Sequence, residues 1–475
     1  MNDSPVPYVQ VEMPARTFLR AATLLVAVFA VVLAPPLGAQ STDTLRLGLE
    51  EAVTRILRTS DESRIADAQV ALLDAQVLSA RAGGLPQVRL ASSYQQIVRN
   101  ARADIVGQVF NQRFNYNTNI QLQQSLFQGG RVVSAAQAAS RAGRAAVATR
   151  EETRAQLAVG MQRTYLNVVF TARLLDIQQR NLVLADERLA QTEQLERAGR
   201  SSRYEVLRAR VERANLEPVV RQAEADQELA ELELRRLLNV PLDRPLLLTT
   251  DLDATRVRAF AEAAASNAST APTAIRASVR AAEATASARA ASIRVARADL
   301  LPSLNATVTG GFLALPRITG FPSGFERANG WYPDQSFQFF FSWPLFDGLR
   351  AKGAIDLAQA QEQLATLELR RVREEAAIDI ARAEAELARA RAVALARETT
   401  VREAEEAFEL ASLRFARGIG TQLEVSDAQL AMLTARSTDA RATFDLYLAV
   451  AELARVRAEP IPLPEGGSVS TRISR

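Results

Sequence analysis

The sequence predicts a mainly α-helical fold in which long helical hairpins alternate with pairs of β-strands. Three observations support this prediction. Residues 114–123 alternate strictly between apolar and polar side chains, as in a strand with two different faces. Residues 351–417 contain no proline and a single glycine, as a very long helix requires. Both patterns occur twice along the chain, in the same order.

The composition argues against several kinds of chemistry. The 475 residues include no cysteine and no histidine, which rules out thiol nucleophiles, Ser-His-Asp triads and the usual zinc and haem ligand sets. A carboxylate-only enzyme is the alternative, but no confined pair of carboxylates stands out from the helical charge pattern. We therefore predict no enzymatic activity, no cofactor and no metal site. The net charge of +3 is the remainder of 57 basic and 54 acidic residues interleaved along helices, which predicts no nucleic-acid partner.

Residues 1–39 read as a secretory signal peptide. Arg16 and Arg20 precede an apolar run at 21–34, and Ala39 is a small residue at the expected cleavage site. The alternative is a retained membrane anchor. The apolar run is short for that role, because a spanning helix needs about 20 apolar residues.

Residues 40–245 are predicted to form a first structural repeat. Its apolar periodicity is helical at first, with Asp61 as an interruption, and changes to strand-like alternation from Val88. In chain order we expect a helix at 45–82, a strand pair at 85–127 around a polar loop at 100–113, and a helical hairpin at 131–239.

Residues 246–460 are predicted to form a second structural repeat with the same order. Pro86 and Pro302 are 216 positions apart, and Gly129 and Gly348 are 219 apart, so the second copy has three additional loop residues. We expect short helices, a strand pair at 301–346 around a loop at 315–333, a helical hairpin at 350–458, and a loosely ordered tail at 461–475.

Each hairpin is predicted to turn at glycine. The first long helix ends at Gly199, and the second ends at Gly418 and Gly420. A capping box follows each turn, at residues 202–205 in one copy and 421–424 in the other. Both long helices should therefore fold back tightly into antiparallel hairpins.

The strands have the length and composition of membrane strands. Sixteen of the 27 aromatic residues fall within 85–130 and 301–350, as in the outer face and interfacial girdles of a membrane barrel. A soluble sheet with one apolar face is the alternative. Only four strands are predicted, whereas a membrane barrel needs about eight or more because open edges cannot be left in lipid. We therefore expect several copies of the chain to share one barrel.

Taken together, these features resemble the TolC-like outer membrane factor family, the exit ducts of tripartite efflux pumps and type I secretion systems. The resemblance covers nearly the whole mature chain. It is carried by the signal sequence, the Leu-Pro pairs at 85–86 and 301–302, the strand exits at 126–131 and 345–350, and the tips at 199–209 and 418–428.

The resemblance implies a homotrimer in which four transmembrane strands per chain complete a twelve-stranded β-barrel in the lipid of the outer membrane. The helical hairpins would continue this barrel as a periplasmic α-barrel. The implied partners are a periplasmic adaptor (membrane fusion) protein and an inner-membrane efflux or secretion transporter. The implied activity is passive: adaptor and pump open the duct at its periplasmic tip.

Residues 423–428 resemble the gate segment of that family. Glu424 and Asp427 are three residues apart and so lie on one helical face. Three copies would form rings of negative charge that bind cations and disfavour anions. For Glu424 the alternative is a purely local role, because an acid in the first turn can cap the helix and its negative charge interacts favourably with the helix dipole.

Other tip residues are assigned by the same resemblance. In the first repeat, Glu205 occupies the first acidic position, but Arg208 replaces the second acid, so only the second repeat should line the gate with paired acids. Arg414 and Arg417 are expected to pair with acids of a neighbouring hairpin or to be solvated at a helix C-terminus. Adaptor docking, or simple helix termination, is expected at Gly199, Ser202, Gly418, Gly420 and Thr421.

The main rival from another functional class is an elongated structural or adhesion protein, anchored in the envelope, that uses the helices as a coiled-coil spacer. The high alanine content mildly favours a hollow duct, since a solid coiled coil has larger residues at its core positions.

Overall fold

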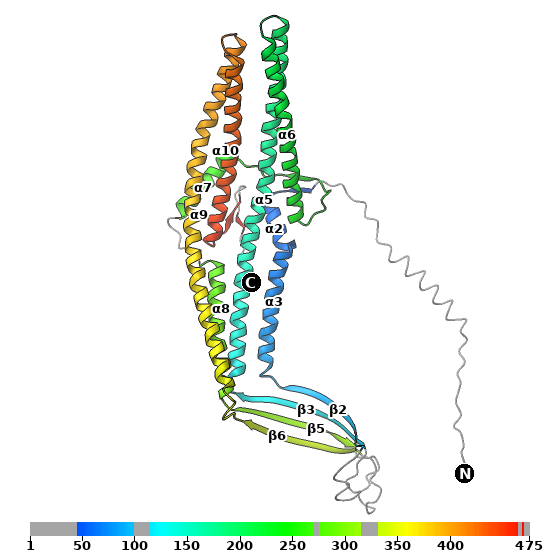
Figure 1. Ribbon diagram of the computed structural model, residues 1–475. Helices are drawn as coiled ribbons and strands as arrows, with labels where there is room; N and C mark the ends of the chain where they lie inside the picture. Colours follow the sequence, from blue (N-terminus) through cyan, green and yellow to red (C-terminus); the bar gives the residue numbers. More distant parts are fainter. Residues whose placement is uncertain (1–44, 99–113, 269–274, 315–330, 464–467, 470–475) are drawn as a thin grey trace, which may run out of the picture. The chain divides into compact units, whose positions relative to one another are not determined.

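The computed structural model describes residues 45–98, 114–268, 275–314, 331–463 and 468–469 (Figure 1). The predicted signal peptide and the loop at 100–113 lie outside these residues. The chain divides into two units, Met1–Leu45 with Asp243–Leu247, and Arg46–Leu242 with Leu248–Arg475. Within the smaller unit, the backbone N–H of Leu45 donates to the carbonyl of Pro245 at 3.0 Å.

The larger unit is mainly helical. Its two longest helices, α5 and α9, have 67 residues each, and the helices that follow them, α6 and α10, have 35 each. The helices are α2 (Leu49–Thr59), α3 (Asp61–Ala82), α5 (Arg131–Arg197), α6 (Arg203–Leu237), α7 (Ala254–Ala268), α8 (Ala277–Arg297), α9 (Arg350–Ala416) and α10 (Gln422–Val456). None of these described helices is both long and apolar enough to cross a bilayer.

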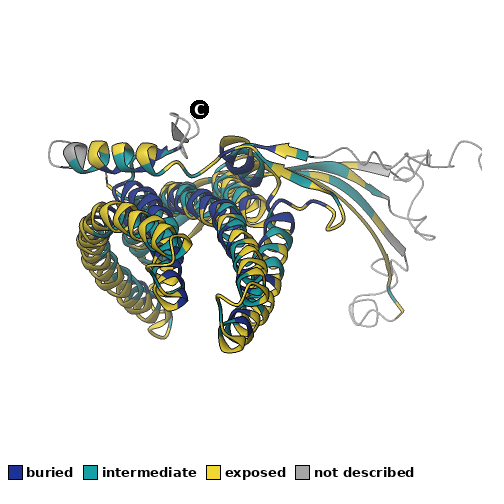
Figure 2. Ribbon diagram, turned by 90° about the horizontal axis from the view of Figure 1, so that it is seen from above, coloured by how far each residue is buried: buried dark blue, intermediate teal, exposed yellow. Residues whose placement is uncertain are grey.

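The long helices pack in pairs along their length. Near the tips α5 pairs with α6 and α9 with α10, while nearer the strands α3 and α8 pack on α5, and α8 also packs on α9 (Figure 1). Helix α10 also packs on α5 and so joins the two hairpins. Many buried positions are alanine, for example Ala145, Ala158, Ala383 and Ala390. Small side chains let neighbouring helix axes approach closely, and buried residues face the neighbouring helices in Figure 2.

A buried ionic cluster ties four helical segments together. Glu152 of α5 accepts from Arg276, which precedes α8, and from Arg455 of α10, each at 2.8 Å. Arg276 also lies 2.7 Å from Asp379 of α9. The side chains of Glu152, Arg276 and Arg455 are 10%, 12% and 11% exposed. Since an unpaired buried charge is costly, this cluster fixes how the segments pack.

The four long strands form one antiparallel sheet in the order β2-β3-β5-β6. They are β2 (Gln87–Gln96), β3 (Phe114–Gln128), β5 (Ser303–Ala314) and β6 (Trp331–Ser342). In the middle of the sheet the register aligns side chains of similar polarity. One row reads Val88, Leu122, Val308, Phe337, and the next row, on the opposite face, reads Arg89, Gln121, Thr309, Ser336.

Both faces and both edges of this sheet are open within the chain. Leu90, Phe337 and Phe339 on the apolar face are 72%, 63% and 59% exposed. Strands β2 and β6 each have one unpaired edge in the sheet of the described residues. At Gly311 the backbone of β3 comes so close that an added Cβ would lie 2.3 Å from the carbonyl oxygen of Thr118.

Several predicted boundaries are wrong. Residues Leu45–Leu47 form strand β1 instead of the start of a helix. The interruption predicted at Asp61 is confirmed: α3 begins there, after Ser60, which caps α3 by accepting from the N–H of Ser63. Strand β3 runs on to Gln128 through an irregularity between Ser125 and Phe127. Strand β6 begins at Trp331, inside the predicted loop, because its whole length pairs with β5.

The tail is also more ordered than predicted at its start. Strand β7 (Ile461–Pro462) pairs with β8 (Ser468–Val469), and Ile461 and Leu463 are each 1% exposed. The hydroxyl of Tyr447 donates to the carbonyl of Pro462 at 2.8 Å. Buried apolar side chains and a hydrogen bond to α10 hold this segment, which its proline- and glycine-rich sequence did not reveal. The remaining short strand, β4, is Leu246–Leu248.

Candidate functional site at the helical tips

The first tip joins α5 to α6 through a left-handed residue and a complete capping box. Gly199 has φ 69°, a conformation that side chains other than glycine rarely adopt. Ser202 accepts from the N–H of Glu205, and Glu205 accepts from the N–H of Ser202 at 2.9 Å. The hydroxyl of Ser201 also donates to Glu205. This hydrogen bond and that from the Ser202 N–H lower the pKa of Glu205.

The second tip, between α9 and α10, has a weaker cap. Gly418 has φ 76°, and Thr421 accepts from the N–H of Glu424 at 3.2 Å. The side chain of Glu424 does not return to the helix N-terminus, so the predicted second capping box is wrong. It lies 3.7 Å from Arg414 instead, across its own turn. The ion pair competes with the cap for the same carboxylate.

The two predicted gate acids lie on the surface of α10. Glu424 and Asp427 are both exposed. Asp427 makes no hydrogen bond or ion pair with any described residue, and the same holds for the exposed side chain of Arg417. Arg414 lies near an acid of its own hairpin, 3.7 Å from Glu424. The side chain of Asp427 is therefore exposed and has no partner among the described residues.

A polar network beside residues 423–428 joins three helices. Arg188 of α5 donates to Ser426 at 3.2 Å and to Gln429, both on α10. Ser426 in turn donates to Glu212 of α6 at 3.1 Å, and Glu212 pairs with Arg208 at 3.1 Å. The network links the first hairpin to the return helix of the second.

The deepest part of this network is an amide pair. Gln429 and Asn181 are 5% and 4% exposed, and the amide of Gln429 donates to Asn181. Burial lowers the pKa of Arg188, an effect that the charge of Glu212 opposes. Because buried polar groups are costly without partners, this network holds α10 against α5 in one register.

Sequence reasoning missed the network residues. Their partners are far apart in the chain: Arg188 and Ser426 are separated by 238 positions. One local pattern points to Gln429, which interrupts a buried apolar stripe of α10 that includes Val425 and Met432. Gln422 interrupts the same stripe, but its side-chain amide has no hydrogen-bond partner among the described residues. A polar residue within such a stripe is a sign of a buried hydrogen bond.

The fold and the tips define a class of protein. Two copies of a helical hairpin, each preceded by a strand pair that carries an exposed apolar face, are the architecture of outer membrane channels. The profile of the outer membrane efflux protein family matches residues 55–240 and 273–458. The chain belongs to this family. It is accordingly an outer membrane transport protein that extends into the periplasm, and a passive channel instead of an enzyme.

Solved structures with this fold come from several bacteria. The outer membrane protein VceC of Vibrio cholerae is 20% identical, with a TM-score of 0.69, covering 86% of this chain and 96% of that one. The Campylobacter jejuni CmeC outer membrane channel is 15% identical, with a TM-score of 0.71 and coverage of 86% and 85%. The open Neisseria gonorrhoeae MtrE outer membrane channel is 21% identical, with a TM-score of 0.68 and coverage of 86% and 89%. No curated protein sequence matches the chain significantly.

Proposed function

We propose that the protein is the exit duct of a tripartite efflux pump or a type I secretion system. Three chains assemble, their strands complete a twelve-stranded β-barrel in the outer membrane, and their hairpins form a periplasmic α-barrel. An adaptor docks near Gly199, Ser202, Gly418, Gly420 and Thr421, and an inner-membrane transporter supplies the cargo. The two repeats, 40–245 and 246–460, supply equivalent parts of this wall.

The sheet is the observation that carries the proposal. One face is mainly apolar and the other mainly polar, with Leu313, Tyr332 and Phe340 as exceptions on the polar face, and both outer strands keep an unpaired edge. In lipid, unpaired backbone groups cost several kcal/mol each, by the general estimate for buried polar groups. Pairing β6 of one chain with β2 of the next removes both edges. It places the apolar face toward lipid and the polar face toward a water-filled lumen.

The tips supply the gate. Asp427 and Glu424 from three chains form acidic rings at the narrow end, where they select for cations. The network of Arg188, Ser426 and Glu212 holds α10 in the closed position. The duct opens when adaptor and pump break these contacts and the hairpins untwist.

Planar-bilayer recording of the purified full-length protein tests the proposal. We expect discrete channels whose reversal potential in a KCl gradient shows cation preference. Asp427→Asn should reduce that preference about two- to fivefold, because roughly one charge per chain leaves the constriction. Glu409→Gln serves as the matched control, since Glu409 is an exposed acid of α9 without a described role.

Two results would count against different parts of the proposal. If the protein forms no channel, the proposed duct function is wrong and a coiled-coil spacer is favoured. If Asp427→Asn forms channels with unchanged ion selectivity, the duct function stands but the assignment of Asp427 to the gate is wrong. Deleting the gene and comparing drug sensitivity with secreted-protein profiles then separates efflux from secretion.

A further inference from the structure

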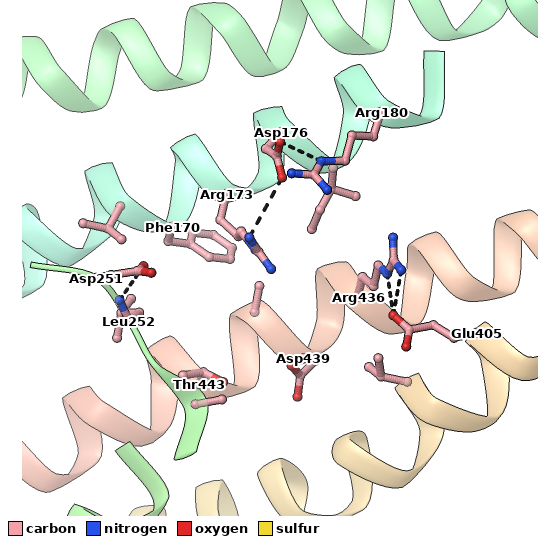
Figure 3. Close-up of a pocket in the computed structure, with 15 residues that line it drawn as sticks. Phe170, Arg173, Asp176, Arg180, Asp251, Leu252, Glu405, Arg436, Asp439 and Thr443 are labelled. Carbon is pink, nitrogen blue, oxygen red and sulfur yellow. Dashed lines mark hydrogen bonds and ion pairs between the residues drawn. The ribbon is translucent and has the colours of Figure 1, made fainter. Parts of the chain in front are cut away.

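A cavity of about 390 Å³ lies away from the tips, where both hairpins meet (Figure 3). Its walls come from α5, α9, α10 and the segment at 251–254. Drug-sized ligands occupy cavities of roughly 300–1,000 Å³. The apolar part of the lining consists mainly of Val169, Phe170, Ile177, Leu252 and Val401.

Most charged groups around the cavity already have partners. Asp176 pairs with Arg180 at 2.9 Å, and Glu405 pairs with Arg436 at 2.7 Å. Asp251 accepts from the backbone N–H of Leu252 at 2.8 Å. One acidic side chain of the lining remains without such a partner among the described residues.

That side chain is Asp439 of α10. It is one of the residues that line the cavity, and Figure 3 shows its carboxylate on the side of α10 that faces α9. It is half-buried and makes no hydrogen bond or ion pair with any described residue. Burial raises its pKa, and the charges that act on it come from Arg173 of α5, Arg258 of α7 and Glu398 of α9.

The nearby arginines are already engaged by other acids. Arg258 pairs with Glu398 at 2.7 Å, and Arg173 lies 3.9 Å from Asp176. The lining carries three arginines and four acids, so its net charge is negative. An unpaired carboxylate in a mainly polar lining that also includes Phe170, Ile177 and Val401 is complementary to a cation attached to a small apolar body.

We propose that this cavity binds monocationic organic amphiphiles. The ammonium group pairs with the carboxylate of Asp439, and the apolar body packs against Phe170, Ile177 and Val401. The site is separate from the acidic gate, and binding is expected whether or not the chain conducts ions. Its walls belong to both hairpins, so a bound ligand braces α10 against α5.

Isothermal titration calorimetry on the purified full-length protein tests the proposal with three probes of one shape. These are 4-phenylbutylammonium, 4-phenylbutanol and 4-phenylbutanoate. We expect the ammonium probe to bind at least tenfold more tightly than the alcohol, and the carboxylate probe to bind most weakly. Asp439→Asn should lower the affinity for the ammonium probe roughly 10- to 100-fold, which corresponds to the loss of one charged hydrogen bond. The affinity for the alcohol probe should not change.

Control measurements separate the site from general surface charge. Glu409→Gln removes an acid from the exposed surface of α9 and should leave all three affinities unchanged. Affinity for the ammonium probe should fall as the pH falls through the raised pKa of Asp439, above the ordinary range near 4, whereas Asp439→Asn should show no such decline. Equal binding of the three probes, undiminished ammonium binding by Asp439→Asn, or no binding at millimolar probe would each overturn the proposal.

Discussion

If the proposed function is right, replacing Arg188 with methionine should favour opening of the tip. The change removes two hydrogen bonds from a charged donor, to Ser426 and to Gln429, while the methionine keeps the apolar stem in place. It leaves Glu212 with Arg208 and Ser426, so no acid is stranded. Most of the lost free energy comes from the buried side-chain oxygen of Gln429, because this oxygen no longer has a hydrogen-bond donor.

The cost can be bounded from these contacts. Hydrogen bonds to charged groups contribute about 1.5–3 kcal/mol each, and an unsatisfied buried acceptor costs about 1–3 kcal/mol. Water can replace the part-buried bond to Ser426, so we count only the buried acceptor of Gln429, at the middle of its range, which gives about 2 kcal/mol per chain. That free energy changes a closed-to-open equilibrium by roughly 30-fold.

Single-channel recording measures this change directly. Arg188→Met should raise the open probability at least tenfold, and Ser426→Ala, which removes one weaker link, should raise it about fivefold. Arg221→Met is the control, because Arg221 pairs with Glu224 on the exposed surface of α6 and its side chain is 73% exposed. If Arg188→Met opens no more often than Arg221→Met, the network does not hold the gate.

Three further predictions concern stability. Glu152→Gln should destabilise the protein by about 2–4 kcal/mol, because two buried guanidinium groups lose their shared carboxylate; the thermal midpoint of the detergent-solubilised protein reports this change. Leu349 has φ 70°, and the equivalent residue of the first copy is Gly130 with φ 77°. Because this left-handed conformation is strained for leucine, Leu349→Gly should stabilise the folded protein by about 1 kcal/mol. Gly130→Leu should destabilise it by a similar amount in the same assay. The pKa of Glu205 is lowered in the fold, so its cap should be intact above the ordinary range near 4 and lost as the pH falls through the lowered value. A spin label at Arg200→Cys, in a chain without other cysteines, should gain mobility over that range, and adding Glu205→Gln should abolish the transition.

Local pattern predicted the elements of this protein well. Strict alternation placed the strands, and β3 contains the whole predicted segment 114–123. The absence of proline and glycine placed the 67-residue helix α9 within one residue of its observed ends. The weak points were boundaries set by distant partners. Residues Leu45–Leu47 and Ile461–Pro462 are short strands whose order depends on pairing and burial that no local window contains.

The candidate site was only partly predictable. The positions of Glu424 and Asp427 follow from helix periodicity, because residues three apart share a face wherever the helix lies. The partner of Glu424 does not follow, since Arg414 reaches it only once the turn at Gly418 is built. The same limit explains why the sequence suggested a second capping box that the fold does not form.

The sequence by itself determined which residues form strands and helices, where the hairpins turn, and that each strand has one apolar and one polar face. Backbone geometry imposes these periods, so they can be read without knowing the neighbours. Only the tertiary structure decided that Arg188 meets Ser426, that Glu152 is shared by two arginines, and that Asp439 faces a cavity without a partner. Those contacts depend on how α5, α9 and α10 are rotated and shifted against one another, which the packing of side chains far apart in the chain sets.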